Sequence, residues 1–296
     1  MTAIRAASPS EVLYKAASKA AGRRRSVTRR RLPLIIGLVL LAIAILAITF
    51  APLLTSAAPN QIDVLNPLAP PLTPGHLLGT DQFGRDLWSR ILYGGRIDLA
   101  IAFGATIVTL VGGTIIGLVA GYYGGKIDNV LMRIVDMVLA IPAIFLFILM
   151  SILFTPNAIT LSMIIASVGW GGVARLVRGE TLSVRGRDFM LATRSLGASN
   201  LRLMLRHLLP NVLPVMIVAA SLGVGAIILA EAALDFLGFG IHPPTASWGN
   251  MLSNAQTYFA HSIWLVIFPG IMIFVTVLAA NLFGNAVRDA FDPRLR

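Results

Sequence analysis

Two carboxylates stand one helical turn apart in an otherwise apolar part of the chain. Glu231 and Asp235 are separated by Ala-Ala-Leu, so on a helix both carboxylates lie on the same face. They could line a path through a membrane and meet cationic groups, or hydrogen-bond inside a helix bundle. A third option is a metal site with His242, but a lone histidine beside carboxylates is not a diagnostic ligand set. We therefore expect no metal site.

The sequence contains no motif for hydrolysis or for phosphate binding. No Gly-x-x-x-x-Gly-Lys-Ser/Thr loop, no Gly-x-Ser-x-Gly and no His-Glu-x-x-His is present, and the 4 histidines are scattered. There are 0 cysteines, which excludes disulfides and thiolate metal sites. We expect a non-catalytic chain that carries no cofactor and cannot hydrolyse ATP itself.

The composition is that of an integral membrane protein. Of the 296 residues 56% are hydrophobic and only 12% are charged, whereas a soluble domain has roughly 25% charged residues. The mean hydropathy is +0.81. The net charge of +11 would suit nucleic acid, but the basic residues flank apolar segments, which is the pattern of membrane orientation. We expect a lipid bilayer around this chain and no nucleic-acid partner.

Six apolar segments are long enough to cross a bilayer, which takes about 20 residues each. The uncharged stretch 137–174 is too long for one crossing, and Thr155-Pro156-Asn157 divides it into two. A short amphipathic helix over residues 86–93 leads into the second crossing. The predicted crossings are 33–53, 99–125, 134–154, 159–177, 211–234 and 262–285.

The distribution of basic residues predicts the orientation of the chain. With six crossings, 21 of the 24 Lys and Arg residues fall on the side of both termini, and only Arg85, Arg90 and Arg96 fall on the other. Basic residues concentrate on the cytoplasmic side, so both termini should be cytoplasmic. This gives three regions: a basic cytoplasmic tail over 1–31, a first transmembrane helix with an extracytoplasmic segment over 32–97, and a five-helix core over 98–296 with a cytoplasmic loop at about 178–210.

The cytoplasmic loop carries two short amphipathic helices. Gly197 can take φ > 0 and lets the chain turn between them, Ser199 or Asn200 can cap the second helix, and Pro210 should stop it. The second helix should bury one apolar face and turn two arginines away from it: the apolar residues are Leu201, Met204, Leu205 and Leu208, and the arginines are Arg202 and Arg206. Such a segment either lies in the lipid headgroups or docks onto another protein.

Polar and small residues elsewhere predict contacts inside the bundle. Asp86 can pair with Arg85 or with Arg90, and Arg133 can pair with Asp136 on one helical face. A stripe of glycines every four residues predicts a close approach of two helices. The stripe consists of Gly113, Gly117, Gly121 and Gly125.

Five blocks of this sequence resemble the C-type permease subunit of dipeptide/oligopeptide ABC importers. Four of the blocks are residues 79–94, 117–136, 231–252 and 281–294. The fifth is the loop, where that family has Glu-Ala-Ala, a glycine, and then a branched residue, leucine and proline. Here the corresponding positions are Leu191, Ala192, Thr193, Gly197, His207, Leu209 and Pro210, with Leu191 in place of the glutamate and His207 in place of the branched residue. Ala198, directly after the glycine, is a further candidate residue of this coupling loop. In the block 231–252 Asp235 replaces the usual serine.

The resemblance implies an all-α integral membrane protein with six transmembrane helices, both termini cytoplasmic and the type I ABC importer permease fold. It further implies a multi-pass protein of a bacterial or archaeal plasma (inner) membrane. The implied partners are a homologous second permease, two cytoplasmic ATPase subunits and an extracytoplasmic solute-binding protein. Residues 188–210 would couple to the ATPases, and Glu231 and Asp235 are candidates for the translocation path.

Two alternatives stay open from the sequence. The same architecture could import nickel or oligosaccharides. A proton-coupled secondary carrier could instead use Asp136, Glu231 and Asp235. The chain shows no inverted repeat and no paired broken helices, which are typical of such carriers.

Overall fold

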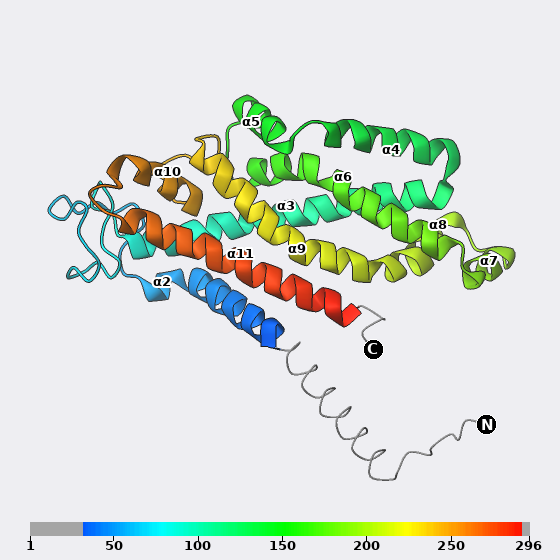
Figure 1. Ribbon diagram of the computed structural model, residues 1–296, viewed down its shortest axis with the longest axis horizontal. Helices are drawn as coiled ribbons and strands as arrows, with labels where there is room; N and C mark the ends of the chain where they lie inside the picture. Colours follow the sequence, from blue (N-terminus) through cyan, green and yellow to red (C-terminus); the bar gives the residue numbers. More distant parts are fainter. Residues whose placement is uncertain (1–31, 292–296) are drawn as a thin grey trace, which may run out of the picture.

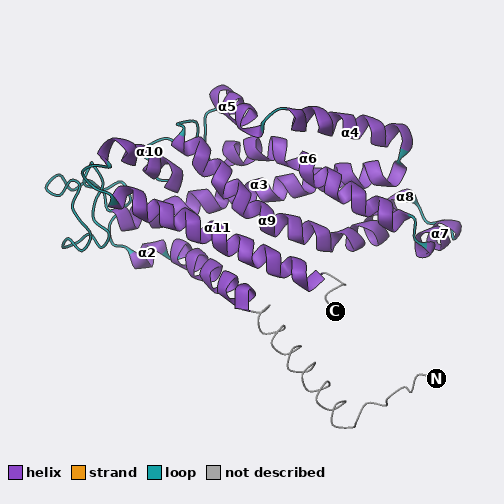
Figure 2. Cartoon of the chain, viewed as in Figure 1, coloured by secondary structure: helices purple, strands orange, loops and turns teal. Residues whose placement is uncertain are grey.

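The computed structural model describes residues 32–291, and the helices there are joined by loops with three isolated β-bridges between single residues. The basic tail predicted over residues 1–31 and the last residues, 292–296, lie outside the described part of the chain. Figures 1 and 2 show the long helices running side by side along the molecule. The helices are Leu32–Thr49, α2 Ala51–Leu54, α3 Leu87–Tyr123, α4 Gly125–Ala140, α5 Ala143–Leu153, α6 Ala158–Arg185, α7 Asp188–Ser195, α8 Asn200–Leu203, the π-helix η1 Met204–Leu208, α9 Leu209–Phe236, α10 Trp248–Tyr258 and α11 Trp264–Phe291.

The number of crossings agrees with the sequence. Five helical segments within residues 32–291 are long and apolar enough to span a membrane, and the pair α4–α5 makes six if it counts as one span. The five are Leu32–Thr49, Leu87–Tyr123, Ala158–Arg185, Asn200–Phe236 and Trp264–Phe291.

The third crossing differs from the straight helix predicted over residues 134–154. It is bent by 84° between α4 and α5. The bend lies at Ile141 and Pro142, and Pro142 is the residue before the first turn of α5. Proline lacks an N–H and pushes the residue before it out of the helical region, and Ile141 is indeed extended. The sequence prediction missed the bend because it used hydropathy and charge, which do not change at Pro142.

The second crossing begins earlier than predicted. The helix expected over residues 86–93 and the crossing expected from residue 99 form one helix of 37 residues. Asp86 starts it, since its carboxylate accepts the backbone N–H of Ser89 at 2.7 Å.

The glycine stripe packs α3 against α6. A Cβ on Gly117 would lie 2.6 Å from the carbonyl oxygen of Ala174, and one on Gly113 would lie 2.6 Å from Cβ of Val173. Gly121 is similarly close to Thr181. Gly125 does not take part, because it begins α4 with φ +55° and has open space around it. The close approach is therefore confirmed for three of the four glycines.

Two predicted ion pairs are wrong. Asp86 does not pair with Arg85 or Arg90; it caps α3 and contacts His76 Nδ1 at 3.0 Å. Asp136 pairs across the bundle with Arg175 of α6 at 2.6 Å instead of with Arg133 on its own helix. Local spacing could not show that α6 lies along α4. A second bridge between the same two helices, Arg178 to Asp128 at 2.5 Å, confirms that they are neighbours.

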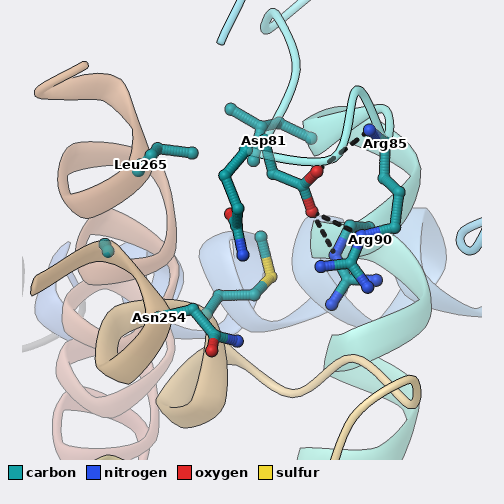
Figure 3. Close-up of a pocket in the computed structure, with 9 residues that line it drawn as sticks. Asp81, Arg85, Arg90, Asn254 and Leu265 are labelled. Atoms are coloured by element: carbon teal, nitrogen blue, oxygen red, sulfur yellow. Dashed lines mark hydrogen bonds and ion pairs between the residues drawn. The ribbon is translucent and has the colours of Figure 1, made fainter. Parts of the chain in front are cut away.

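The two ends of the bundle differ in character. At one end lie α10 and the loop segment between α2 and α3; at the other lie α7 and α8 (Figure 1). Arg85 and Arg90 fix the loop end through Asp81, at 2.6 and 3.5 Å, and Figure 3 shows both arginines turned toward that carboxylate. Arg90 also donates to the carbonyl oxygen of Pro59 and to Oδ1 of Asn60. All three predicted outer arginines, Arg85, Arg90 and Arg96, lie toward this end, near the start of α3.

Candidate functional site

The predicted turn at Gly197 is present between α7 and α8. Gly197 has φ +83°, a conformation that residues with a side chain rarely adopt. Ser199 caps α8, because its hydroxyl accepts the backbone N–H of Arg202 at 3.4 Å. Both local predictions for this segment are confirmed. Asn200 has a different task, since its side chain accepts a hydrogen bond from the hydroxyl of Tyr122 in α3 at 2.6 Å.

Pro210 does not stop the second helix, contrary to the prediction. Asn200–Phe236 is continuous, and the π-helix η1 joins α8 to α9. Pro210 lies in the first turn of α9, directly after η1. A π turn widens the backbone hydrogen-bonded ring, so the proline ring avoids the carbonyl that it would meet in a regular α-helix. The loop helix and the membrane helix therefore form one element.

The π turn also changes which residues face the core. Leu203 and Leu208 are buried, five residues apart, together with Met190 of α7. Leu201 and Leu205, expected on the buried face with Met204 and Leu208, are 62% and 53% exposed. The prediction assumed α-helical spacing throughout, whereas the π turn Met204–Leu208 shifts the face of the residues within and after it by about one position. Leu201 precedes that turn, and the turn does not explain its exposure.

The predicted coupling residues lie on the surface of this end. Leu191, Ala192, Gly197 and Pro210 are exposed, whereas Thr193, Ala198 and Leu209 are half-buried. Leu196 is 89% exposed, and Arg194 and Arg202 lie on the same segment. A hollow between α6 and α7 beside them is lined by Leu182, Arg185, Met190, Leu191 and Arg194. Exposed leucines ringed by arginines suit contact with a protein surface.

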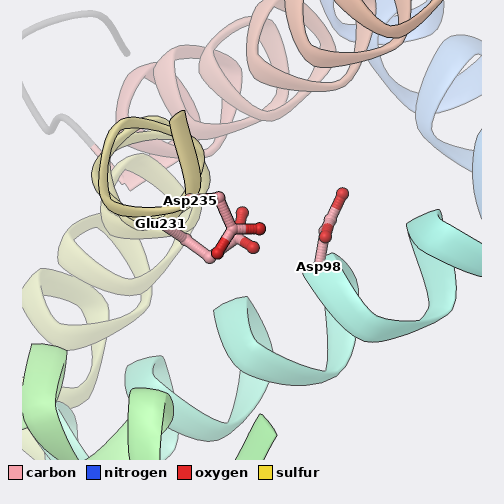
Figure 4. Close-up of side chains that lie close together, drawn as sticks. All are labelled: Asp98, Glu231 and Asp235. Carbon is pink, nitrogen blue, oxygen red and sulfur yellow. The ribbon is translucent and has the colours of Figure 1, made fainter. Parts of the chain in front are cut away.

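Glu231 and Asp235 lie at the opposite end of the same continuous helix. They are 1% and 2% exposed, and Asp98 of α3, which is 0% exposed, completes a cluster of three carboxylates. Figure 4 shows the Glu231 and Asp235 side chains together on α9 across from Asp98. One oxygen from each residue lies within 4.8 Å of the others. Sequence reasoning missed Asp98, which is far away along the chain; the available signal was a carboxylate at the start of a long apolar stretch.

Donors from the loop before α10 and from the first residue of α10 hold two of these carboxylates. The backbone N–H of Trp248 donates to Oδ2 of Asp98 at 3.0 Å, and the N–H of Ile241 donates to Oδ1 of Asp235 at 2.5 Å. The hydroxyl of Ser247 donates to the other oxygen of Asp235. His242, considered above as a ligand beside these carboxylates, is exposed and is not a member of the cluster. The cluster thus joins α3, α9 and the start of α10.

One family model matches more than half of the chain. Residues 113–296 match the binding-protein-dependent transport system inner membrane component. Similar curated proteins are a putative peptide transport system permease protein of Brucella suis, 42% identical over 90% of both chains, and a dipeptide transport system permease protein of Alkalihalophilus pseudofirmus, 41% identical over 88% of this chain and 86% of that protein. An oligopeptide transport system permease protein of Bacillus subtilis is 34% identical over 88% of this chain and 85% of that protein.

A solved structure supports the fold. A chain of the MetNI methionine ABC transporter, described as inward facing, superimposes with a TM-score of 0.55 and 20% identity, covering 68% of this chain and 95% of that chain. The helices and spans described above are thus those of a type I ABC importer permease. The family match and the membrane-spanning helices make this a multi-pass protein of the inner membrane, and the chain belongs to the family of binding-protein-dependent transport system inner membrane components.

Proposed function

We propose that this chain forms half of a translocation path for dipeptides or oligopeptides. It would pair with a homologous second permease, two cytoplasmic ATPases and an extracytoplasmic solute-binding protein, and it would not itself be catalytic. The proposal rests on the 42% identity over 90% of the chain to a protein named as a putative peptide transport permease, with further relatives named for dipeptides and oligopeptides.

A growth experiment tests the substrate class. In a strain of the source organism that requires one amino acid, deletion of this gene should abolish growth on a dipeptide that supplies it and leave growth on the free amino acid unchanged. Restoring the gene should restore growth. Normal dipeptide growth in the deletion strain, with loss of nickel or oligosaccharide uptake instead, would favour the alternative cargoes and reject the peptide proposal.

We infer that the segment Asp188–Leu208 is the docking site for one ATPase. Its exposed leucines and arginines, with the hollow next to α6, offer the contact surface. Because α8, η1 and α9 are continuous, a displacement of the loop moves α9 as a body. ATP-driven closure of the ATPases would in this way open the permease toward the other side of the membrane.

The proposed path runs along an apolar groove between α3, α6 and α9. Small residues line the groove about halfway along these helices: Gly169, Gly172, Ala219, Ala220, Gly223 and Ala226. A Cβ added to Gly172 or to Gly223 would meet no atom within 4 Å, so the chain itself leaves this space open. Glu231 and Asp235 remain predicted path residues, but their burial against Asp98 supports the alternative that they act inside the bundle.

A further inference from the structure

The cluster of Asp98, Glu231 and Asp235 has a charge that the protein does not balance. None of the ion pairs among residues 32–291 includes any of the three carboxylates. All three side chains are at least nine-tenths buried. An isolated buried carboxylate is strongly unfavourable, and three together add mutual repulsion. A positive species must therefore accompany them when the protein is folded.

Glu231 shows where that species would lie. Neither of its carboxylate oxygens receives a hydrogen bond in the described part of the chain, although the residue is only 1% exposed. Oδ1 of Asp98 is buried and unpartnered as well. Asp98 lies across from Glu231 and Asp235 (Figure 4), and one oxygen of each of the three residues lies within 4.8 Å of the others. Buried polar atoms are nearly always satisfied, so unpartnered carboxylate oxygens at this position point to a ligand that the described residues do not supply.

The hydrogen bonds to Asp98 and Asp235 orient these two carboxylates as the ligands of a cation would be oriented. The N–H of Trp248 holds Oδ2 of Asp98, and the N–H of Ile241 and the Ser247 hydroxyl hold the two oxygens of Asp235. Oδ1 of Asp98 and both oxygens of Glu231 stay free. This is the arrangement in which outer hydrogen bonds orient the ligands of a metal. Three oxygens within 4.8 Å of one another are close enough for a single ion to contact all of them.

The donor chemistry selects the class of ion. The cluster offers carboxylate oxygens and neither sulfur nor nitrogen, which is the ligand set of hard cations. A divalent ion balances more of the three charges than a monovalent ion does. Mg²⁺ usually keeps several waters in an octahedral shell, whereas Ca²⁺ accepts irregular protein oxygens, including a bidentate glutamate. We propose that Asp98, Glu231 and Asp235 bind a divalent cation of the calcium class.

Such an ion would brace one end of the permease. It would tie α3 to α9, and through Trp248 and Ser247 it would hold the start of α10 against both. The sequence led us to expect no metal, because a lone histidine beside two carboxylates is not a diagnostic ligand set; the fold adds Asp98 to those two carboxylates. The proposal concerns binding and stability, so it stands or fails independently of which substrate the complex transports.

Calcium binding and thermal stability test the site. The assembled permease complex, purified in buffers stripped of divalent metals, is treated with EDTA, dialysed and measured at pH 7.5 with 1 mM Ca²⁺ or with 1 mM Mg²⁺. We expect Ca²⁺ to raise the unfolding temperature by roughly 5–10 °C, as for a ligand present well above its dissociation constant, and Mg²⁺ to act less. Equilibrium binding of radioactive calcium should give one ion per copy of this chain.

Two variants and a control test whether calcium binding and the rise in unfolding temperature come from this cluster. Glu231→Gln removes one charge and supplies an amide donor to its neighbours, so this variant should fold without the ion and lose both the calcium shift and the bound calcium. Asp98→Asn should do the same and serves if Glu231→Gln does not assemble. Glu180→Gln, the same change in α6, should keep both. No calcium binding by the unaltered complex, or equal binding by Glu231→Gln and Asp98→Asn, would overturn the proposal and leave protons as the balancing charge.

Discussion

The hydroxyl of Tyr122 donates to the side-chain oxygen of Asn200 at 2.6 Å and so fastens the end of α3 to the start of α8. This bond links the proposed ATPase-docking segment to the helix that carries Asp98. A buried or half-buried neutral hydrogen bond contributes about 1 kcal/mol. We therefore expect this hydrogen bond to orient the segment Asp188–Leu208 relative to α3, and its loss to leave the rest of the fold intact.

Tyr122→Phe should weaken the coupling of ATP hydrolysis to transport. Removing the hydroxyl should cost about 1 kcal/mol of stability, leave the amount of assembled complex nearly unchanged, and lower the substrate transported per ATP hydrolysed. The measurement is that ratio in reconstituted complexes. Tyr123→Phe is the matched control, because its ring adjoins Tyr122 and its hydroxyl takes no part in the Asn200 bond. An equal loss in both variants would remove the specific role of Tyr122.

Gly197→Val should separate the ATPase from the permease. Gly197 has φ +83°, so a β-branched side chain there strains the turn although nothing blocks it sterically. We expect normal insertion in the membrane and a large fall in ATPase co-purification.

The control for that change is Gly179→Val. Gly179 lies in α6 outside the hollow, has open space around it and does not have a positive φ. It should retain the ATPase. Full uptake by a normally expressed Gly197→Val protein would contradict the docking role of the turn.

Gly223→Leu should block the path without harming the fold. A Cβ at Gly223 meets nothing within 4 Å, and the leucine would fill the groove between α3, α6 and α9. Uptake should fall at least tenfold while the amount of complex is maintained. Gly179→Leu, at an equally open position of α6 outside the groove, should transport normally. Normal uptake by Gly223→Leu would show that the path lies elsewhere.

The orientation can be checked with reporters. The charge distribution places Asn200 in the cytoplasm and Ala246 outside. An alkaline phosphatase fusion should thus be active after Ala246 and inactive after Asn200. Asn200 begins the continuous helix Asn200–Phe236, and Ala246 lies in the loop that follows its other end. Activity after Asn200 and none after Ala246 would show that the topology is the reverse of the one predicted.

The features that local chemistry determines could be predicted from the sequence. Hydropathy located the crossings, the conformational freedom of glycine located the turn at Gly197, and the hydroxyl of Ser199 predicted a helix cap. Each of these depends on residues close together in the chain. The glycine stripe also predicted a close helix contact, although it could not name α6 as the partner.

The features that the sequence did not show depend on distant parts of the chain or on backbone adjustments. Asp98 joins Glu231 only because α3 and α9 meet, and Asp136 finds Arg175 only because α6 lies beside α4. Pro210 predicted a helix end, but the π turn before it allowed the helix to continue. Proline excludes a regular α-helical bond and does not exclude a wider one.

Reconstitution of the complete transporter tests the central claim most directly. The permease pair, the two ATPases and the solute-binding protein are placed in proteoliposomes, and uptake of a radiolabelled dipeptide is followed with ATP or with an imposed proton gradient. We predict that uptake requires ATP and the solute-binding protein and stops when this permease is omitted. The imposed proton gradient should have no effect on it. Dipeptide accumulation driven by the proton gradient without ATP would contradict the account and make the chain a secondary carrier.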